Sequence, residues 1–169
     1  MAKRDASYDA IYDSEVTNPW HFWSGGGRRQ FVVSRRFEEY LAEDPEEASR
    51  IPILQTSSRY RQNKYTAVDS PIPFLTWQEM QLIRAEVAVR SNAPGTALEF
   101  INTIRKFYRL SVISEDPTLD DVLVERDKEL FCTGLRLVDQ RRTGSWHLPL
   151  GTWQYIPISQ RERDSNANL

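Results

Sequence analysis

A short aromatic sequence near the start of the chain has the residue types best suited to binding a ligand. Trp20, His21, Phe22 and Trp23 are consecutive, and the flexible sequence Ser-Gly-Gly-Gly follows them at 24–27. Flat aromatic rings stack on the C–H faces of sugars, and neighbouring donors fix the sugar hydroxyls. The alternative is that one or both indoles fill the core beneath a loop. The predicted ligand-binding residues are Asn18, Trp20, His21, Trp23 and Arg28, with Arg29 as a further donor.

Other patterns that could support catalysis or metal binding are weak. His21 and His147 are the two histidines, and neither has Cys or acidic partners at the spacing of zinc ligands. The sequence has no nucleophile-elbow motif. Its triglycine is followed by Arg28-Arg29 instead of the Lys-Ser or Lys-Thr pair of a phosphate-binding loop. We therefore predict a protein that is not an enzyme, with no catalytic residue, no metal and no cofactor.

Two carboxylates one helical turn apart, Glu125 and Glu129, have the spacing of a general acid and base. Arg126 and Lys128 lie between them, however, and further charges of both signs follow. Charges that alternate along a helix usually form ion pairs with their surroundings. The sequence therefore favours a structural network of ion pairs over a hydrolytic site.

The composition limits the remaining classes of function. The 169 residues carry 22 basic and 24 acidic side chains, and a net charge of -2 gives no electrostatic footprint for nucleic acid. The hydrophobic fraction of 40% is enough for a folded domain. Cys132 is the one cysteine, which excludes an intrachain disulfide. Because its neighbours are apolar, we expect a buried, unreactive thiol.

The candidate residues depend on elements that lie mostly later in the chain. Residues 1–70 are predicted to be loop-rich, with a short helix from Arg35 to Leu41 that ends near Asp44-Pro45, and a strand over 51–54. Residues 71–144 have strong helical patterns. Residues 145–169 are predicted to form an irregular tail that is aromatic at first and polar at its end.

Three capping boxes, at 76–79, 96–99 and 118–121, predict where the main helices begin. The turn at 92–95 is short, so we expect the first two helices to pack antiparallel. The first has one apolar stripe of Met80, Ile83 and Val87 and another of Leu82 and Val89, which predicts that it is sandwiched between neighbours. The inner face of the second is predicted to comprise Ala97, Phe100, Ile101, Ile104 and Tyr108, opposite Asn102, Arg105 and Lys106.

The third helix is expected to run unbroken to about Arg142. Gly134 lies in the middle of this span, where glycine is about 1 kcal/mol less favourable than alanine. A close contact with a neighbouring helix would explain it. The predicted inner face comprises Leu119, Val122, Leu123, Leu130, Phe131, Leu135 and Val138.

Four motifs occur in the order in which the SusD/RagB family has them. Residues 71–86 resemble the family's helix R-x-x-E-x-x-L-I-x-A-E-A, and residues 97–105 resemble A-L-x-x-I-N-x-V-R. Residues 125–144 are similar to E-R-x-x-E-L-x-x-E-G-x-R-x-x-D-L-R-R-x-G, and 155–169 to the closing P-I-P-x-x-E-x-x-x-N-P-x-L. Residues 37–50 resemble F-x-x-Y-x-x-x-D-x-R, with 63–65 as the x-K-Y. Thr133, Gln140 and Ala167 depart from the usual Glu, Leu and Pro.

The resemblance covers residues 10 to 169 and implies a mainly α fold, with tetratricopeptide-like helix pairs and a loop-rich C-terminal region. It implies non-catalytic binding of a glycan or another nutrient by a surface lipoprotein of the bacterial outer membrane. The partner would be a TonB-dependent transporter of the SusC type. Family members are several hundred residues long and begin with a signal peptide and a lipid-anchor cysteine. We therefore expect residues 1–169 to be a C-terminal segment whose N-terminal repeat half is absent.

The matched motifs are mostly structural, so they leave the ligand open: starch, another polysaccharide, a host glycan or a peptide. A function of another class also remains, namely a helical scaffold that binds a protein partner and no small molecule. An open aromatic surface distinguishes the two, because stacking on a sugar needs exposed ring faces.

Overall fold

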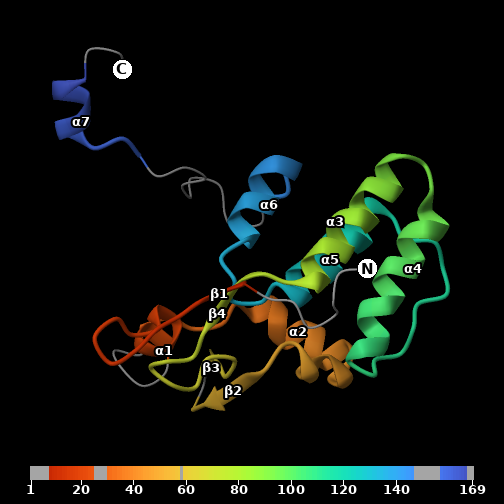
Figure 1. The fold of residues 1–169 in the computed structure, drawn as a ribbon, viewed down its shortest axis with the longest axis horizontal. Helices are drawn as coiled ribbons and strands as arrows, with labels where there is room; N and C mark the ends of the chain where they lie inside the picture. The colour runs from red at the N-terminus through yellow and green to blue at the C-terminus, as the bar shows by residue number, and fades with distance from the viewer. Residues whose placement is uncertain (1–7, 25–29, 58, 147–156, 167–169) are drawn as a thin grey trace. The chain divides into compact units, whose positions relative to one another are not determined.

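The computed structural model describes residues 8–24, 30–57, 59–146 and 157–166. The chain divides into two units, Met1–Leu135 and Arg136–Leu169. The elements of the first unit are β1 (Tyr8–Ala10), α1 (Pro19–Ser24), α2 (Arg35–Glu43), the 3-10 helix η1 (Pro45–Ser49), β2 (Ile53–Thr56), β3 (Arg59–Gln62), β4 (Ile72–Leu75), α3 (Trp77–Arg90), α4 (Pro94–Phe107) and α5 (Leu119–Glu129). The second unit contains α6 (Arg136–Thr143) and α7 (Gln160–Ser165) (Figure 1). The predicted mainly α fold is confirmed, and no helix in the described ranges combines the length and hydropathy needed to span a bilayer.

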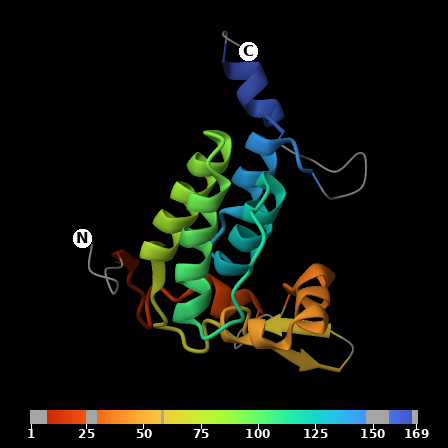
Figure 2. The same ribbon diagram turned by 90° about the vertical axis from the view of Figure 1, so that its right-hand side faces the viewer.

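The main core lies where α3 packs against α4 and α5, which run side by side in Figure 2. Residues 91–93 connect α3 to α4, so the two helices are antiparallel as expected. Small side chains on both helices let their axes approach closely. The buried members of this cluster are Ala85, Ala88, Ala97, Ile101 and Val122. Burial of the Ile101 side chain alone contributes roughly 1.5–3 kcal/mol.

The outer face of α3 differs from the prediction. Leu82 is buried, but Met80, Ile83 and Val87 are 41%, 42% and 58% exposed. The helix is therefore covered on one side within the described residues and is not sandwiched. The sequence pattern identifies the apolar side chains of both stripes. Tertiary packing decides that only one stripe faces the core.

Two of the three predicted helix starts are confirmed. The Thr76 hydroxyl accepts a hydrogen bond from the Glu79 N–H, and Thr118 forms a complete capping box with Asp121. The box at 96–99 is wrong, because α4 already begins at Pro94. Proline suits the first helical position, where its missing N–H leaves no hydrogen bond unmade.

The predicted long helix to Arg142 is also wrong. It ends at Glu129, and α6 begins at Arg136. Between them Cys132 has φ 57° and Gly134 has φ 87°, values that an α-helix does not allow. A Cβ added at Gly134 would meet no atom within 4 Å. The glycine is therefore explained by its backbone conformation and not by a close helix contact.

Two small antiparallel sheets hold the first third of the chain in place. β1 pairs with β4, and β2 pairs with β3 in register from Ile53–Gln62 to Thr56–Arg59. Sequence reasoning anticipated only a strand over 51–54. A second core joins this region to α2 and to the end of α5, with Phe37 and Phe131 in edge contact at 4.7 Å between ring centroids. Ile51 is fully buried beside them.

We expect alanine substitutions at two glycines to have different effects on stability. Gly134→Ala forces a Cβ into the left-handed region and should destabilise the chain by about 1 kcal/mol. Gly95→Ala lies in the first turn of α4, with 3.7 Å to Asp116, and should be neutral or up to about 1 kcal/mol stabilising. Urea unfolding followed by circular dichroism measures both. Equal shifts of the same sign would contradict the conformational explanation.

Candidate functional site

The aromatic sequence predicted to bind ligand lies on α1, a six-residue helix, and not in an irregular loop. Pro19 occupies the first helical position, and Asn18 precedes it. The Asn18 side-chain oxygen accepts the His21 N–H at 3.0 Å, and its amide nitrogen donates to the Ser70 carbonyl at 2.7 Å. These bonds cap α1 and anchor it to the segment before β4.

Asn18 therefore has a different role from the predicted one. Its side chain is fully buried and both of its polar groups are used within the fold. An amide in this position is not accessible to a ligand. Its influence on binding would act through the position of α1. Arg28 and Arg29 lie outside the described residues.

The remaining aromatic and histidine side chains of α1 point in different directions. Trp20 lines one cavity, and His21 lines another. Trp23 packs against Phe22 and Phe31, with ring centroids 5.1 and 5.9 Å apart. Successive residues of a helix are rotated by about 100°, so neighbours in sequence do not share a face. The structure thus divides the predicted surface in two and places Trp23 in an aromatic cluster.

The cavity beside Trp20, which we name the Trp20 cavity, has a volume of about 490 Å³. This is within the size range of sites for small ligands, roughly 300–1,000 Å³. Three aromatic side chains, Tyr12, Trp20 and Phe74, contribute to its wall. The other lining residues are Ala10, Ile72, Pro73, Leu75, Thr76, Glu79, Leu130, Thr133, Gly134 and Leu135. The left-handed turn at 132–134 therefore forms part of this wall.

A few polar groups lie among these apolar side chains. The Thr76 oxygen accepts the Glu79 N–H at 3.2 Å, which leaves its hydroxyl hydrogen available for donation. The Thr133 hydroxyl donates to the Leu130 carbonyl at 2.7 Å and keeps lone pairs that can accept. Aromatic faces with a small number of oriented hydroxyls are a combination that can hold a sugar ring.

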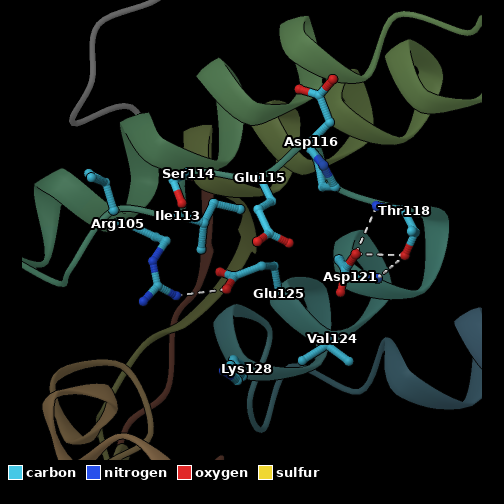
Figure 3. A pocket seen from close by; sticks show the side chains of 12 residues that line it. Arg105, Ile113, Ser114, Glu115, Asp116, Thr118, Asp121, Val124, Glu125 and Lys128 are labelled. Atoms are coloured by element: carbon cyan, nitrogen blue, oxygen red, sulfur yellow. Dashed lines mark hydrogen bonds and ion pairs between the residues drawn. The ribbon is translucent and has the colours of Figure 1, made fainter.

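A third cavity, of about 570 Å³, lies between α4, α5 and the loop that joins them (Figure 3). We name it the Arg105 cavity. Its loop contributes Glu115 and Asp116, and α5 contributes Asp121 and Glu125. Figure 3 shows the Arg105 guanidinium directed at Glu125, which accepts its hydrogen bond at 2.8 Å. The Glu125 carboxylate is therefore already ion-paired.

Glu125 belongs to a buried network of ion pairs. Arg50 lies 2.7 Å from Glu125 and 3.8 Å from Glu129. Glu47 accepts from Arg50, Arg105 and Lys128 at 2.9, 3.2 and 3.1 Å. Arg105 was predicted on the polar face of its helix, but it is 6% exposed and joins this network. The network confirms that Glu125 and Glu129 are structural carboxylates.

The network separates the pKa values of its carboxylates. Burial opposes ionisation of Glu47, but Arg50 and Lys128 lower the pKa of Glu47 to about 2. Burial raises the pKa of Glu129, which Arg50 and the Tyr108 hydroxyl only partly offset. Glu129 accepts that hydroxyl at 2.9 Å. Both carboxylates are buried and hydrogen-bonded within the network.

The Cys132 thiol and the potential metal ligands are the remaining groups with possible chemistry. Burial raises the pKa of the Cys132 thiol to about 12, so the sulfur is protonated and a weak nucleophile at neutral pH. In the described ranges, no three His, Cys, Asp or Glu side chains are grouped so that they could hold a metal ion.

Comparison with solved structures finds similarity to a "putative sugar binding protein" from Bacteroides vulgatus. The TM-score is 0.70 and the sequence identity is 26%. The match covers 81% of this chain and 34% of the other, so the chain spans about a third of that protein's length. No protein-family model and no curated protein matches the sequence. The comparison agrees with the mainly helical fold.

We expect Glu47→Gln to destabilise the chain by about 3 kcal/mol at neutral pH, because Arg50, Arg105 and Lys128 each lose a carboxylate partner in a buried setting. The lowered pKa of Glu47 means that its stabilisation is present above about pH 4.5 and is lost as the pH falls towards 2. The stability difference between the native chain and the variant should therefore shrink over this range. Urea unfolding at a series of pH values measures it.

Glu46→Gln is the matched control, because Glu46 is the exposed preceding residue. The free energy of unfolding of the Glu46→Gln variant should differ from that of the native chain by less than about 0.5 kcal/mol. A Glu47→Gln effect of similar size, or one that stays constant from pH 6 to 2, would contradict the described network.

Proposed function

We propose that this chain is a glycan-binding part of a nutrient-capture protein of the SusD/RagB type, and that the Trp20 cavity holds a sugar ring. The cavity carries the proposal, since it combines three aromatic side chains with hydroxyls at its edge. The sugar-binding name of the similar Bacteroides vulgatus protein supports the same class of ligand.

In this proposal, Trp20 stacks on the C–H face of the sugar, and Tyr12 or Phe74 limits its tilt. The Thr76 hydroxyl donates to a sugar oxygen. Trp23 holds Phe31 against α1 through its packing on Phe22 and Phe31. His21 belongs to the second cavity and contributes separately.

Binding without catalysis is part of the proposal, and the ion pairing of Glu125 and Glu129 supports it. Glycoside hydrolysis needs two accessible carboxyl groups on either side of the bond to be cleaved. Glu125 and Glu129 are instead held by Arg50, Arg105 and Tyr108. The ligand is therefore released unchanged.

The cellular role is proposed from the sequence motifs. A SusD/RagB-type protein lies at the surface of the outer membrane and passes its glycan to a SusC-like TonB-dependent transporter. The order of the motifs at 71–86, 97–105 and 125–144 supports this assignment.

A second function, protein interaction, is favoured by one observation. Met80, Ile83 and Val87 form an exposed apolar stripe on α3. Such stripes are common where a helix contacts another helix in a larger assembly. Self-association of the chain that Val87→Glu abolishes, measured by sedimentation, would support a contact role for this face.

Trp20→Ala should weaken binding of neutral oligosaccharides by about tenfold or more, because the ring that stacks on the sugar is removed. Trp20→Phe keeps an aromatic face and should retain affinity within about threefold. A glycan array selects the ligand, and isothermal titration calorimetry measures the affinities.

Trp23→Ala is the comparison variant. It should lower thermal stability, through loss of the Phe22 and Phe31 contacts, and change sugar affinity less than Trp20→Ala does. A folded Trp20→Ala chain that binds every sugar as the native chain does, or a native chain that binds none, would overturn the proposal.

A further inference from the structure

The cavity beside His21, which we name the His21 cavity, has a volume of about 410 Å³ and is lined mostly by residues that carry polar groups. It lies where α1 meets the β2–β3 hairpin. Its lining residues are His21, Ser24, Leu54, Thr56, Ser57, Arg61, Gln62, Asn63, Tyr65 and Thr66. Arg61 is charged, and none of the described residues in this wall is acidic. In a chain with 24 acidic side chains, a cavity without any carboxylate has a distinct electrostatic character.

Local hydrogen bonds hold the wall in place. The Gln62 amide donates to the Ser24 hydroxyl and to the Tyr65 carbonyl, both at 3.0 Å. Its oxygen accepts the N–H groups of Lys64 and Tyr65 at 2.8 Å. This buried glutamine therefore fixes α1, the end of β3 and Tyr65 to one another. A wall with such bonds is arranged before a ligand arrives.

Among the described residues, no carboxylate compensates the charge of Arg61. Its Nε is buried and makes no hydrogen bond, and the described residues place no carboxylate within ion-pairing distance. A guanidinium is always protonated, and withdrawing one of its N–H groups from water without a partner is unfavourable. Elsewhere in this unit the buried arginines Arg50 and Arg105 have carboxylate partners.

A second polar group of the wall is also without a partner. Tyr65 is 4% exposed, and its hydroxyl makes no hydrogen bond in the described residues. Burial raises the pKa of this phenol, so it remains protonated and neutral. The described lining of the cavity thus combines the Arg61 guanidinium, a histidine and uncharged hydrogen-bonding groups.

The geometry points to the His21 cavity as a subsite for an anionic sugar, in which Arg61 pairs with a carboxylate or sulfate substituent of the glycan. This inference rests on the proposed function, since it assigns the ligand to acidic polysaccharides. The planar guanidinium matches a carboxylate in two parallel hydrogen bonds, which neutral hydroxyls cannot reproduce. His21 and Asn63 lie in the same wall and supply further polar contacts.

The test uses one sugar in two charge states. Oligogalacturonate and its fully methyl-esterified form are titrated into the 169-residue chain by calorimetry. The native chain should bind the acid about tenfold more tightly than the ester, the size expected for a charged hydrogen bond. Arg61→Gln should make the two affinities equal. Arg61→Lys keeps the charge but loses the paired geometry, and should retain part of the preference.

Arg59→Gln is the matched control, since Arg59 lies on the same strand but does not line the cavity. It should retain the preference for the acid. A native chain that binds acid and ester equally would overturn the subsite, as would Arg59→Gln losing the preference for the acid as fully as Arg61→Gln does. If the ester still binds in a way that depends on Trp20, the proposed function is unaffected by that result. No binding of either form would overturn the subsite, whereas the proposed function is overturned only if the native chain binds no sugar on the glycan array. A sulfated galactan is titrated in parallel to identify which anion the subsite binds. Whichever of the two acidic glycans binds the native chain more tightly should lose that extra affinity in Arg61→Gln.

Discussion

The buried Glu47 carboxylate is the interaction on which the arrangement of the first unit depends. It is fully buried on η1 and accepts hydrogen bonds from Arg50 beside it, Arg105 of α4 and Lys128 of α5. Three segments far apart in sequence therefore meet at one group. Removing ions from water is unfavourable unless each finds partners of opposite charge, so this geometry allows few alternatives. The network fixes the distance between η1 and the helices more specifically than apolar packing alone would.

Short stretches of chain connect the buried Glu47 network to the candidate site. Ile51 comes directly after Arg50, is fully buried, and packs with Phe37 and Phe131. The hairpin of β2 and β3 begins two residues later and contacts α1. Phe131 opens the left-handed turn whose residues Thr133 and Gly134 line the Trp20 cavity. Residues that line the Trp20 cavity and the His21 cavity thus lie close in sequence to residues that the ion network and the second core hold in place.

Sequence reasoning succeeded where local patterns determine the structure. The helix starts at Thr76 and Thr118 follow from capping residues, and the buried face of α4 follows from its periodicity.

Sequence reasoning failed where tertiary structure decides. The break after Glu129 depends on the left-handed conformation of Cys132, which a non-glycine side chain does not reveal in sequence. The helix α1 was missed although Asn18-Pro19 is a readable start signal, because six residues show no period. Arg61 gave no signal, since an isolated arginine in a polar segment is ordinary.

The short length of α1 explains how one aromatic sequence can serve two kinds of contact. Trp20 and His21 are neighbours in sequence, yet the helix directs them to cavities of different character. One wall is aromatic and mostly apolar, which suits the C–H face of a sugar. The other is polar and without described carboxylates, which suits the substituents of a sugar. Because Asn18 ties α1 to Ser70 and Gln62 ties it to the hairpin, the two contacts are positioned by one rigid element. A ligand that engaged both would gain affinity without ordering either wall, which is the advantage of a preorganised site.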